Sequence, residues 1–245
     1  MIVFNSLIKN INQKGTRLVL LIDPDRKNKH KINQLVEGAN DNSLEAIFVG
    51  GSLIMDSEYH SRVKIIKEKS NIPVILFPGS VNQINKYFDA VLFMSLISGR
   101  NPQFLIGDQV IAAPIIKDIG IETISTGYML LGSNNMTSAV SFMSNTRPIP
   151  SNRVDIAVAH ALAGQYLGLQ SLYLEAGSGA NNHIPLDVIR EISKNVNIPL
   201  IIGGGISSVK DIVAISKAGA SLIVVSSAFE DSIDNISKFS SALKV

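Results

Sequence analysis

Short runs of apolar residues recur along the chain, and most are followed by a turn and then by an amphipathic segment. Most runs hold four or five residues, mainly β-branched residues and leucine, without polar alternation, which is typical of parallel strands covered on both faces. The clearest eight runs span residues 18–22, 46–49, 74–77, 90–93, 121–125, 171–174, 199–202 and 221–225.

Helical patterns lie between these runs. Examples are 58–69, 153–167, 184–196 and 209–218, the last followed by Gly219 as a helix C-cap. Eight strands alternating with helices predict an α/β fold, a single (β/α)8 barrel of the TIM type that spans residues 1–245 as one domain. A doubly wound open sheet is the main alternative.

Two connections depart from a regular alternation. Only residues 78–89 separate the third and fourth strands, which barely leaves room for a crossover helix with its loops. We therefore expect the helix after the third strand to be shortened or missing. The connection at 126–170 is long instead, and it includes the helix predicted from about residue 153.

Composition and charge narrow the class of protein. Apolar residues make up 46% of the 245 residues and charged residues 17%, which excludes a disordered chain. The formal net charge of +2 and the absence of a long basic run give no signature of a nucleic-acid partner. The chain has no cysteine and no apolar run long enough for a signal peptide or a membrane span. We expect a cytoplasmic protein without stable membrane insertion.

The segments that follow the predicted strands carry the candidate chemistry, because loops at the carboxyl ends of the strands form the working face of such a barrel. The last three strands run into Gly- and Ser-rich loops at 175–179, 203–205 and 226–227. Glycines allow main-chain N–H groups to converge on an anion, and loops after the seventh and eighth strands often cradle phosphate. These loops predict a phosphate site, although the glycines could also serve only tight turns.

Two carboxylates follow the first strand, in Asp23-Pro24-Asp25. Mg2+ binds one or two carboxylates together with water and substrate phosphate oxygens, and the hydroxyl of Ser52 on the next loop could add a ligand. Asp23 and Ser52 are thus candidate Mg2+ ligands. The alternative is that Asp23 and Asp25 only stabilise a turn or cap a helix.

Glu175 comes directly after the sixth strand, among small residues that leave it unshielded. It is a candidate general base, or an acceptor that orients a substrate hydroxyl. The alternative is a salt bridge or a cap. Tyr128 and Tyr173 could line a pocket or belong to the core, and the four histidines have no ligand spacing.

Several motifs together resemble the geranylgeranylglyceryl phosphate synthase family and, less closely, the heptaprenylglyceryl phosphate synthases. The resemblance runs from about residue 18 to residue 230. Its most specific part is Tyr-Leu-Glu-Ala-Gly-Ser-Gly at 173–179. The other motifs are Leu-Ile-Asp-Pro-Asp-Arg at 21–26, Gly-Gly-Ser at 50–52, Phe-Met-Ser-Leu-Ile-Ser-Gly-Arg-Asn-Pro at 93–102, Thr-Gly-Tyr at 126–128 and Ile-Gly-Gly-Gly-Ile at 202–206.

The resemblance implies a modified (β/α)8 barrel and a Mg2+-dependent alkylation. A prenyl diphosphate, expected to be geranylgeranyl diphosphate, would transfer its chain to the 3-hydroxyl of sn-glycerol 1-phosphate and release diphosphate. The resemblance makes Asp23 and Ser52 the Mg2+ ligands, and it implies a homo-oligomer, a dimer or a hexamer. It assigns glycerol phosphate binding to Tyr173, Leu174, Glu175, Ala176, Gly177, Ser178, Gly179, Gly204, Gly205, Ser226 and Ser227.

This chain departs from the family pattern at three positions. Arg26 stands where lysine is usual, and Ser125 replaces a proline that is common before Thr-Gly-Tyr. Ser226-Ser227 stands where glycine followed by asparagine or threonine is usual, so the Cβ of Ser226 changes how closely the main chain can approach phosphate.

Two other functions remain open at this point. One is a phosphosugar isomerase-type barrel enzyme, with Asp23 and Glu175 as its acid and base. The other is a non-catalytic barrel that binds phosphorylated ligands or prenyl lipids. A Schiff-base aldolase is disfavoured, because no predicted strand ends in lysine.

Overall fold

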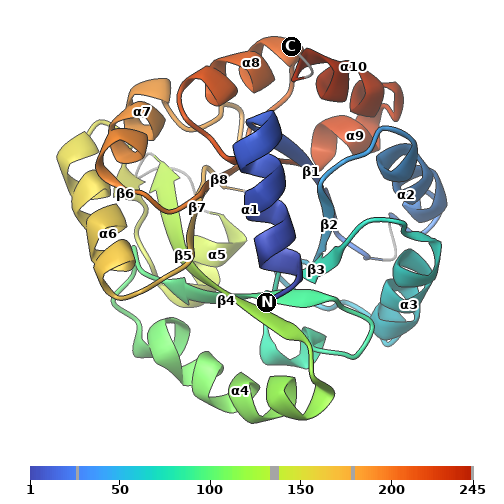
Figure 1. Ribbon diagram of the computed structural model, residues 1–245. Coiled ribbons are helices and arrows are strands. Elements are labelled where there is room, and N and C mark those ends of the chain that lie inside the picture. Colours follow the sequence, from blue (N-terminus) through green and yellow to red (C-terminus); the bar gives the residue numbers. More distant parts are fainter. Residues whose placement is uncertain (26–27, 133–137, 178–179, 244–245) are drawn as a thin grey trace.

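The protein folds as a closed barrel of parallel strands surrounded by helices (Figure 1). The computed structural model describes residues 1–25, 28–132, 138–177 and 180–243. The barrel strands are β1 (Arg17–Ile22), β2 (Ala46–Val49), β3 (Val74–Leu76), β4 (Ala90–Leu96), β5 (Glu122–Gly132), β7 (Ser171–Glu175), β8 (Leu200–Gly203) and β9 (Leu222–Val225). They pair in this order, and β9 pairs with β1 to close the ring. Each of the eight predicted strands is present, and the predicted TIM-type barrel is confirmed.

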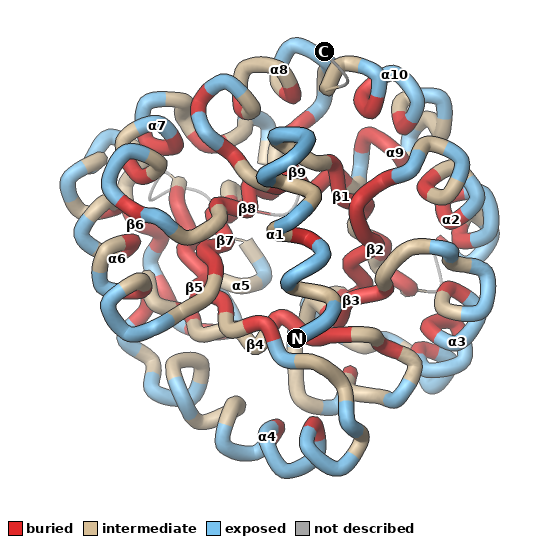
Figure 2. The backbone as a smooth tube through the Cα atoms, viewed as in Figure 1, coloured by how far each residue is buried: buried red, intermediate tan, exposed pale blue. Residues whose placement is uncertain are grey.

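Helices cover the outside of this ring, so that the strands are buried and the outer helix faces are exposed (Figure 2). They are α2 (Ile32–Asp41), α3 (Tyr59–Lys69), α4 (Asp108–Ile119), α6 (Val154–Tyr166), α7 (Leu186–Asn195), α8 (Val209–Lys217), α9 (Ser227–Asp231) and α10 (Asp234–Ala242). Local chemistry fixes some of their ends. The Ser208 hydroxyl accepts from the Asp211 N–H, and the Asp211 carboxylate accepts from the Ser208 N–H, which makes a capping box at the start of α8.

The amino-terminal end of the barrel is closed by α1 (Val3–Lys14), a helix that the sequence analysis did not predict. Leu7 is buried and packs with the inward-facing residues of the strands. The Glu122 carboxylate at the start of β5 accepts hydrogen bonds from the N–H groups of Ile2, Val3 and Phe4. A carboxylate from outside the helix therefore satisfies donors that the first turn of α1 leaves open.

The connection between β3 and β4 holds only a short 3-10 turn, η2 (Val81–Gln83). This confirms the expectation of a shortened helix. α4 contacts both η2 and β4, so it borders the space that a full crossover helix would fill.

The expected loop at 126–170 begins later than the sequence analysis placed it, because β5 continues to Gly132. β4 also runs beyond its predicted end, and the two strands stay paired up to Leu96 and Tyr128. The reason is burial, because every residue of β5 from Thr126 to Leu131 is buried. The remaining connection holds α5 (Ala139–Ser144) and the two-residue strand β6 (Ile149–Pro150).

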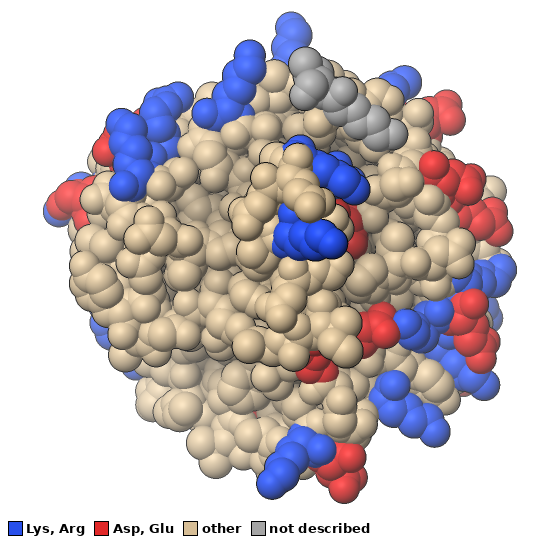
Figure 3. All heavy atoms as spheres, in the orientation of Figure 1, with Lys and Arg blue, Asp and Glu red and all other residues tan. Residues whose placement is uncertain are grey.

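Acidic and basic side chains are interspersed around the face shown in Figure 3, as the small net charge suggests. Within the described residues, no helix is long and apolar enough to cross a bilayer.

Candidate active site

A pocket of about 570 Å3 opens at the carboxyl ends of the strands. Such a volume lies within the range of roughly 300–1,000 Å3 that small-molecule sites occupy. One part is polar and is lined by side chains and loops that follow β1, β7, β8 and β9. The other part is apolar and extends between η2, β4 and α4.

The glycine-rich loops meet at the polar part, as predicted. Five residues from three loops line it: Gly177, Gly204, Gly205, Ser226 and Ser227. Gly204 has a φ of +85°, and a Cβ there would lie 2.5 Å from the Glu175 carboxylate. Only glycine combines this backbone conformation with such close approach, so the rim presents main-chain atoms rather than side chains.

Glu175 lies at the end of β7 and is 7% exposed. The Gly177 N–H donates to its Oε1 at 2.8 Å, and the Tyr173 hydroxyl is hydrogen-bonded to the same carboxylate. Desolvation by burial raises the pKa of Glu175 from 4.5 to about 7, although both hydrogen bonds favour the ionised form. A carboxyl group with such a pKa can accept and release a proton near neutral pH.

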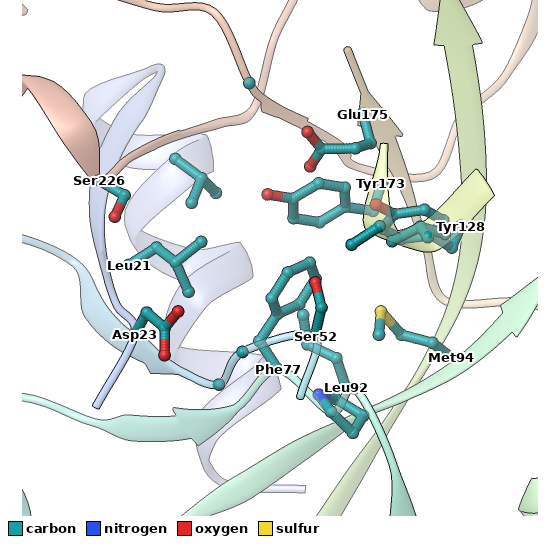
Figure 4. A pocket seen from close by; sticks show the side chains of 18 of the residues that line it. Leu21, Asp23, Ser52, Phe77, Leu92, Met94, Tyr128, Tyr173, Glu175 and Ser226 are labelled. Atoms are coloured by element: carbon teal, nitrogen blue, oxygen red, sulfur yellow. The ribbon is translucent and has the colours of Figure 1, made fainter. Parts of the chain in front are cut away.

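Three aromatic rings form the floor of the pocket beneath this carboxylate (Figure 4). The centroids of Phe77 and Tyr173 are 4.8 Å apart, and those of Tyr128 and Tyr173 are 5.4 Å apart. Burial, together with the charge of Glu175, raises the pKa of both tyrosines well above the usual value. Their hydroxyl groups therefore keep their protons and can act as hydrogen-bond donors.

Asp23 and Ser52 line the same pocket from neighbouring loops (Figure 4). The Asp23 carboxylate lies directly over Gly51, where a Cβ would meet its Oδ1 at 2.6 Å. Arg62 of α3 fixes the loop that carries Asp23. The Arg62 guanidinium donates to the Pro24 carbonyl and forms a 2.6 Å ion pair with Asp56.

The apolar part of the pocket is lined by residues of the shortened connection and of the elements beside it. These residues are Val81, Ile84, Val91, Phe93, Ala112 and Ile116, and together we call them the apolar groove. The groove passes through the gap that the missing crossover helix leaves, so the departure from a regular barrel creates the space.

Not every predicted residue contributes a side chain. Leu174 is buried in the core between strands and helices, and the pocket-lining residues include neither Leu174 nor Ala176. Ser178 and Gly179 lie outside the described residues. Tyr173, Glu175, Gly177, Gly204, Gly205, Ser226, Ser227, Asp23 and Ser52 do meet at one pocket.

Two polar residues near the rim were missed by the sequence analysis. Asn28 is buried, and its amide donates to the Asp23 carbonyl and to Glu230. Glu230 lies four residues after Ser226, and this spacing across the start of a helix was the available signal.

Comparison with known proteins agrees with this geometry. The family model described as "PcrB family" matches residues 10–243. The chain belongs to the PcrB family. The geranylgeranylglyceryl phosphate synthase of Flavobacterium johnsoniae is 45% identical over 214 residues, which cover 87% of this chain and 88% of that protein. The synthase of Methanosphaera stadtmanae is 41% identical over 218 residues, covering 89% and 88% of the two chains.

A solved structure is similar over almost the whole length. It is the (S)-3-O-geranylgeranylglyceryl phosphate synthase from Thermoplasma acidophilum in complex with sn-glycerol-1-phosphate. The TM-score is 0.91 and the identity 31%, and the match covers 99% of this chain and 98% of the other. The predicted family resemblance is thus confirmed.

Proposed function

We propose that this chain is a prenyltransferase that joins a geranylgeranyl chain to the 3-hydroxyl of sn-glycerol 1-phosphate. The observation that carries the proposal is the position of Glu175, a buried carboxylate between a glycine-rich rim and an apolar groove. The relatives named above are synthases of this type, and one of them was crystallised with sn-glycerol-1-phosphate.

The glycerol phosphate binds at the rim formed by the loops after β7, β8 and β9. Main-chain N–H groups of Gly204 and Gly205, with Ser226 and Ser227, suit a phosphate without a lysine or arginine, whereas the Gly177 N–H is already bonded to Glu175. Each hydrogen bond to a charged group contributes about 1.5–3 kcal/mol, so a few donors suffice. This placement puts the far end of the glycerol unit toward Glu175.

The diphosphate of the prenyl donor binds beside Asp23 and Ser52. Their donor set fits Mg2+, since both present hard oxygen atoms to the pocket and the Asp23 carboxylate lies over a glycine that leaves space in front of it. Mg2+ takes one or two protein carboxylates and completes its coordination with water and substrate phosphate oxygens. When bound, Mg2+ neutralises the charge that develops on the leaving diphosphate.

The prenyl chain occupies the apolar groove. Each methylene that it buries contributes about 0.8 kcal/mol, so a twenty-carbon chain gains on the order of 10 kcal/mol before the cost of ordering it. The groove meets the polar part of the pocket near Phe77 and Tyr128.

The reaction is a substitution at the allylic carbon of the donor. The bond from this carbon to the diphosphate oxygen breaks, and a bond to the 3-oxygen of the glycerol unit forms. Glu175 orients the attacking hydroxyl and takes its proton, which the pKa of about 7 permits. The Tyr173 hydroxyl and the Gly177 N–H hold the carboxylate in place.

A direct assay tests the proposal. The protein is incubated with radiolabelled sn-glycerol 1-phosphate, geranylgeranyl diphosphate and Mg2+, and organic-extractable label is counted. The proposal predicts a labelled prenyl ether that is lost when Mg2+ is chelated. Absence of extractable label from a folded, substrate-saturated sample would overturn it and favour a phosphosugar enzyme or a non-catalytic binding protein.

Three further expectations stay predictions. The chain forms a homo-oligomer, a dimer or a hexamer, which light scattering can test; exposed apolar side chains on α4, among them Val110, Ile111 and Ile115, offer a surface for it. Residues 1–245 form one domain, which predicts a single cooperative unfolding transition. The protein is cytoplasmic, which fractionation of the native cells can test.

A further inference from the structure

Two substrate loops of the proposed reaction are joined through one side chain. The loop after β1 carries Asp23, and the loop after β9 carries Ser226. Because β1 and β9 are paired neighbours in the barrel, these loops lie side by side. Glu230, in α9, makes contacts with both loops.

The carboxylate oxygen Oε1 of Glu230 accepts two hydrogen bonds. One comes from the Ser226 hydroxyl at 3.0 Å, and the other from the Asn28 side-chain amide at 3.3 Å. The second hydrogen of the Asn28 amide goes to the main-chain carbonyl of Asp23 at 3.0 Å. A continuous path of hydrogen bonds therefore runs from the main chain of Asp23 to the side chain of Ser226.

Other contacts fix the ends of this path. The Lys31 ammonium donates to the main-chain carbonyl of Glu230 at 2.7 Å, and the Asn28 N–H donates to the Asp25 carbonyl at 3.0 Å. Asn28 is only 6% exposed, so its amide depends on these partners to offset the cost of leaving water. The path is thus a built feature of the rim.

The bond to Glu230 also explains how this chain uses Ser226, which stands where the family resemblance led us to expect glycine. Its hydroxyl donates to a carboxylate, and such a charge-assisted bond is stronger than one to a neutral acceptor. The Ser226 hydroxyl is thereby held by Glu230 at the edge of the pocket that Ser226 lines.

We propose that Glu230 is a positioning residue that sets the loop of Asp23 and the loop of Ser226 relative to each other. This inference rests on the proposed function, because it assigns the two loops to the metal-bound diphosphate and to glycerol phosphate. A single acceptor that fixes both loops would keep the leaving group and the attacking hydroxyl in register.

A matched pair of variants isolates the acceptor. Glu230→Gln and Glu230→Met are similar in size and both uncharged, but only glutamine keeps an oxygen that can accept from Ser226 and Asn28. Glu191→Ala, on an exposed face of α7, serves as a control away from the rim. Two probes report the loops separately: sn-glycerol 1-phosphate by calorimetry, and Mn2+ with inorganic diphosphate by electron paramagnetic resonance.

We expect Glu230→Met to bind both probes about 10-fold more weakly than Glu230→Gln, the size of effect that loss of hydrogen bonds to the rim would give. Glu230→Gln and Glu191→Ala should bind both probes as the wild type does. Equal affinities for the methionine and glutamine variants, or a loss confined to one probe, would overturn the positioning role.

Two outcomes keep the test decisive. If Glu230→Met does not fold, Ser226→Ala replaces it; this variant should weaken glycerol phosphate binding and leave the Mn2+ probe unchanged, and unchanged glycerol phosphate binding would overturn the proposal. If the wild type itself binds neither probe, the proposed function fails as well, which distinguishes the two failures.

Discussion

The amino-terminal end of the barrel is closed by an amphipathic helix, whereas the carboxyl end holds a buried carboxylate among glycines. Both ends contain a glutamate that accepts main-chain N–H groups. Glu122 accepts three of them at the start of α1 and is half-buried; desolvation opposes its ionised form, but these bonds prevail and lower its pKa. Glu175 accepts one main-chain N–H, and desolvation raises its pKa to about 7.

The difference shows how one barrel separates stability from chemistry. At the amino-terminal end, the ionised form of Glu122 is favoured and strengthens the helix that closes the core. At the carboxyl end, the ionised form of Glu175 is disfavoured, which costs stability and suits the proposed role of Glu175 as a base. Substitutions at the two ends should therefore have opposite consequences.

The largest expected effect is on catalysis. Glu175→Gln keeps an acceptor for Gly177 and Tyr173 but cannot take a proton, so turnover should fall about 100- to 10,000-fold. The dissociation constant for glycerol phosphate should change much less. Single-turnover kinetics and calorimetry measure the two quantities, and turnover equal to that of the wild type would rule out the role as a base.

The same variant should be more stable than the wild type at alkaline pH. The pKa of Glu175 in the folded protein lies above its usual 4.5. The wild type therefore has its full stability below pH 4.5, where Glu175 is protonated in the folded and the unfolded state, and loses stability as the pH rises through about 7. At pH 8, Glu175→Gln should gain up to about 3 kcal/mol in free energy of unfolding over the wild type. Urea denaturation at pH 4 and pH 8 checks this, and an equal difference at both pH values would contradict it.

Removal of the proposed metal ligand gives the next effect. Asp23→Asn should raise the Mg2+ concentration needed for half-maximal activity by at least about 10-fold. Asp25→Asn is the matched control, because Asp25 follows two residues later and is not among the residues that line the pocket. Titration of activity with Mg2+ compares the two, and equal shifts would argue against Asp23 as the ligand.

A substitution that fills the apolar groove should weaken binding of the prenyl donor only. Ala112→Phe adds a large side chain to the groove, so the KM for geranylgeranyl diphosphate should rise about 10-fold while glycerol phosphate binding stays unchanged. For a shorter prenyl donor, the same substitution should raise the KM less. Val110→Phe on the exposed side of the same helix is the control. An equal rise in KM for this variant would show that the prenyl chain does not bind in the apolar groove.

The smallest expected effect is a loss of stability on substitution of Glu122 at the amino-terminal end of the barrel. Glu122→Ala removes the acceptor for three N–H groups of α1, so it should cost about 1 kcal/mol of stability, as loss of a helix cap does. Turnover at 25 °C should stay the same. Thermal unfolding and steady-state kinetics test both parts, and a loss of turnover in a fully folded sample would break the separation between the two ends.

The fold could be predicted largely from the pattern of apolar residues. Each barrel strand contains or overlaps a short apolar run, and the short interval at 78–89 indicated the shortened helix. The helix α1 was not predicted, although its apolar residues Phe4, Leu7, Ile8 and Ile11 recur at helical spacing in the sequence. The end of β5 was misplaced because Gly127 and its neighbours resemble a turn in isolation, whereas pairing with β4 keeps them extended.

The candidate site was predictable only where chain position fixes geometry. Strand ends meet at one rim, so Asp23, Glu175 and Gly204 could be placed together from the order of elements alone. The raised pKa of Glu175 and the contacts of Glu230 depend on burial and on side chains from distant segments. Of these properties, only the contact between Ser226 and Glu230, four residues apart, could be read from local spacing.

A crystal structure with sn-glycerol 1-phosphate tests the central claim most directly. We predict the phosphate against the main chain of Gly204 and Gly205, with the 3-hydroxyl within hydrogen-bonding distance of Glu175. A phosphate bound outside this rim, or a glycerol unit that points away from Glu175, would contradict the account.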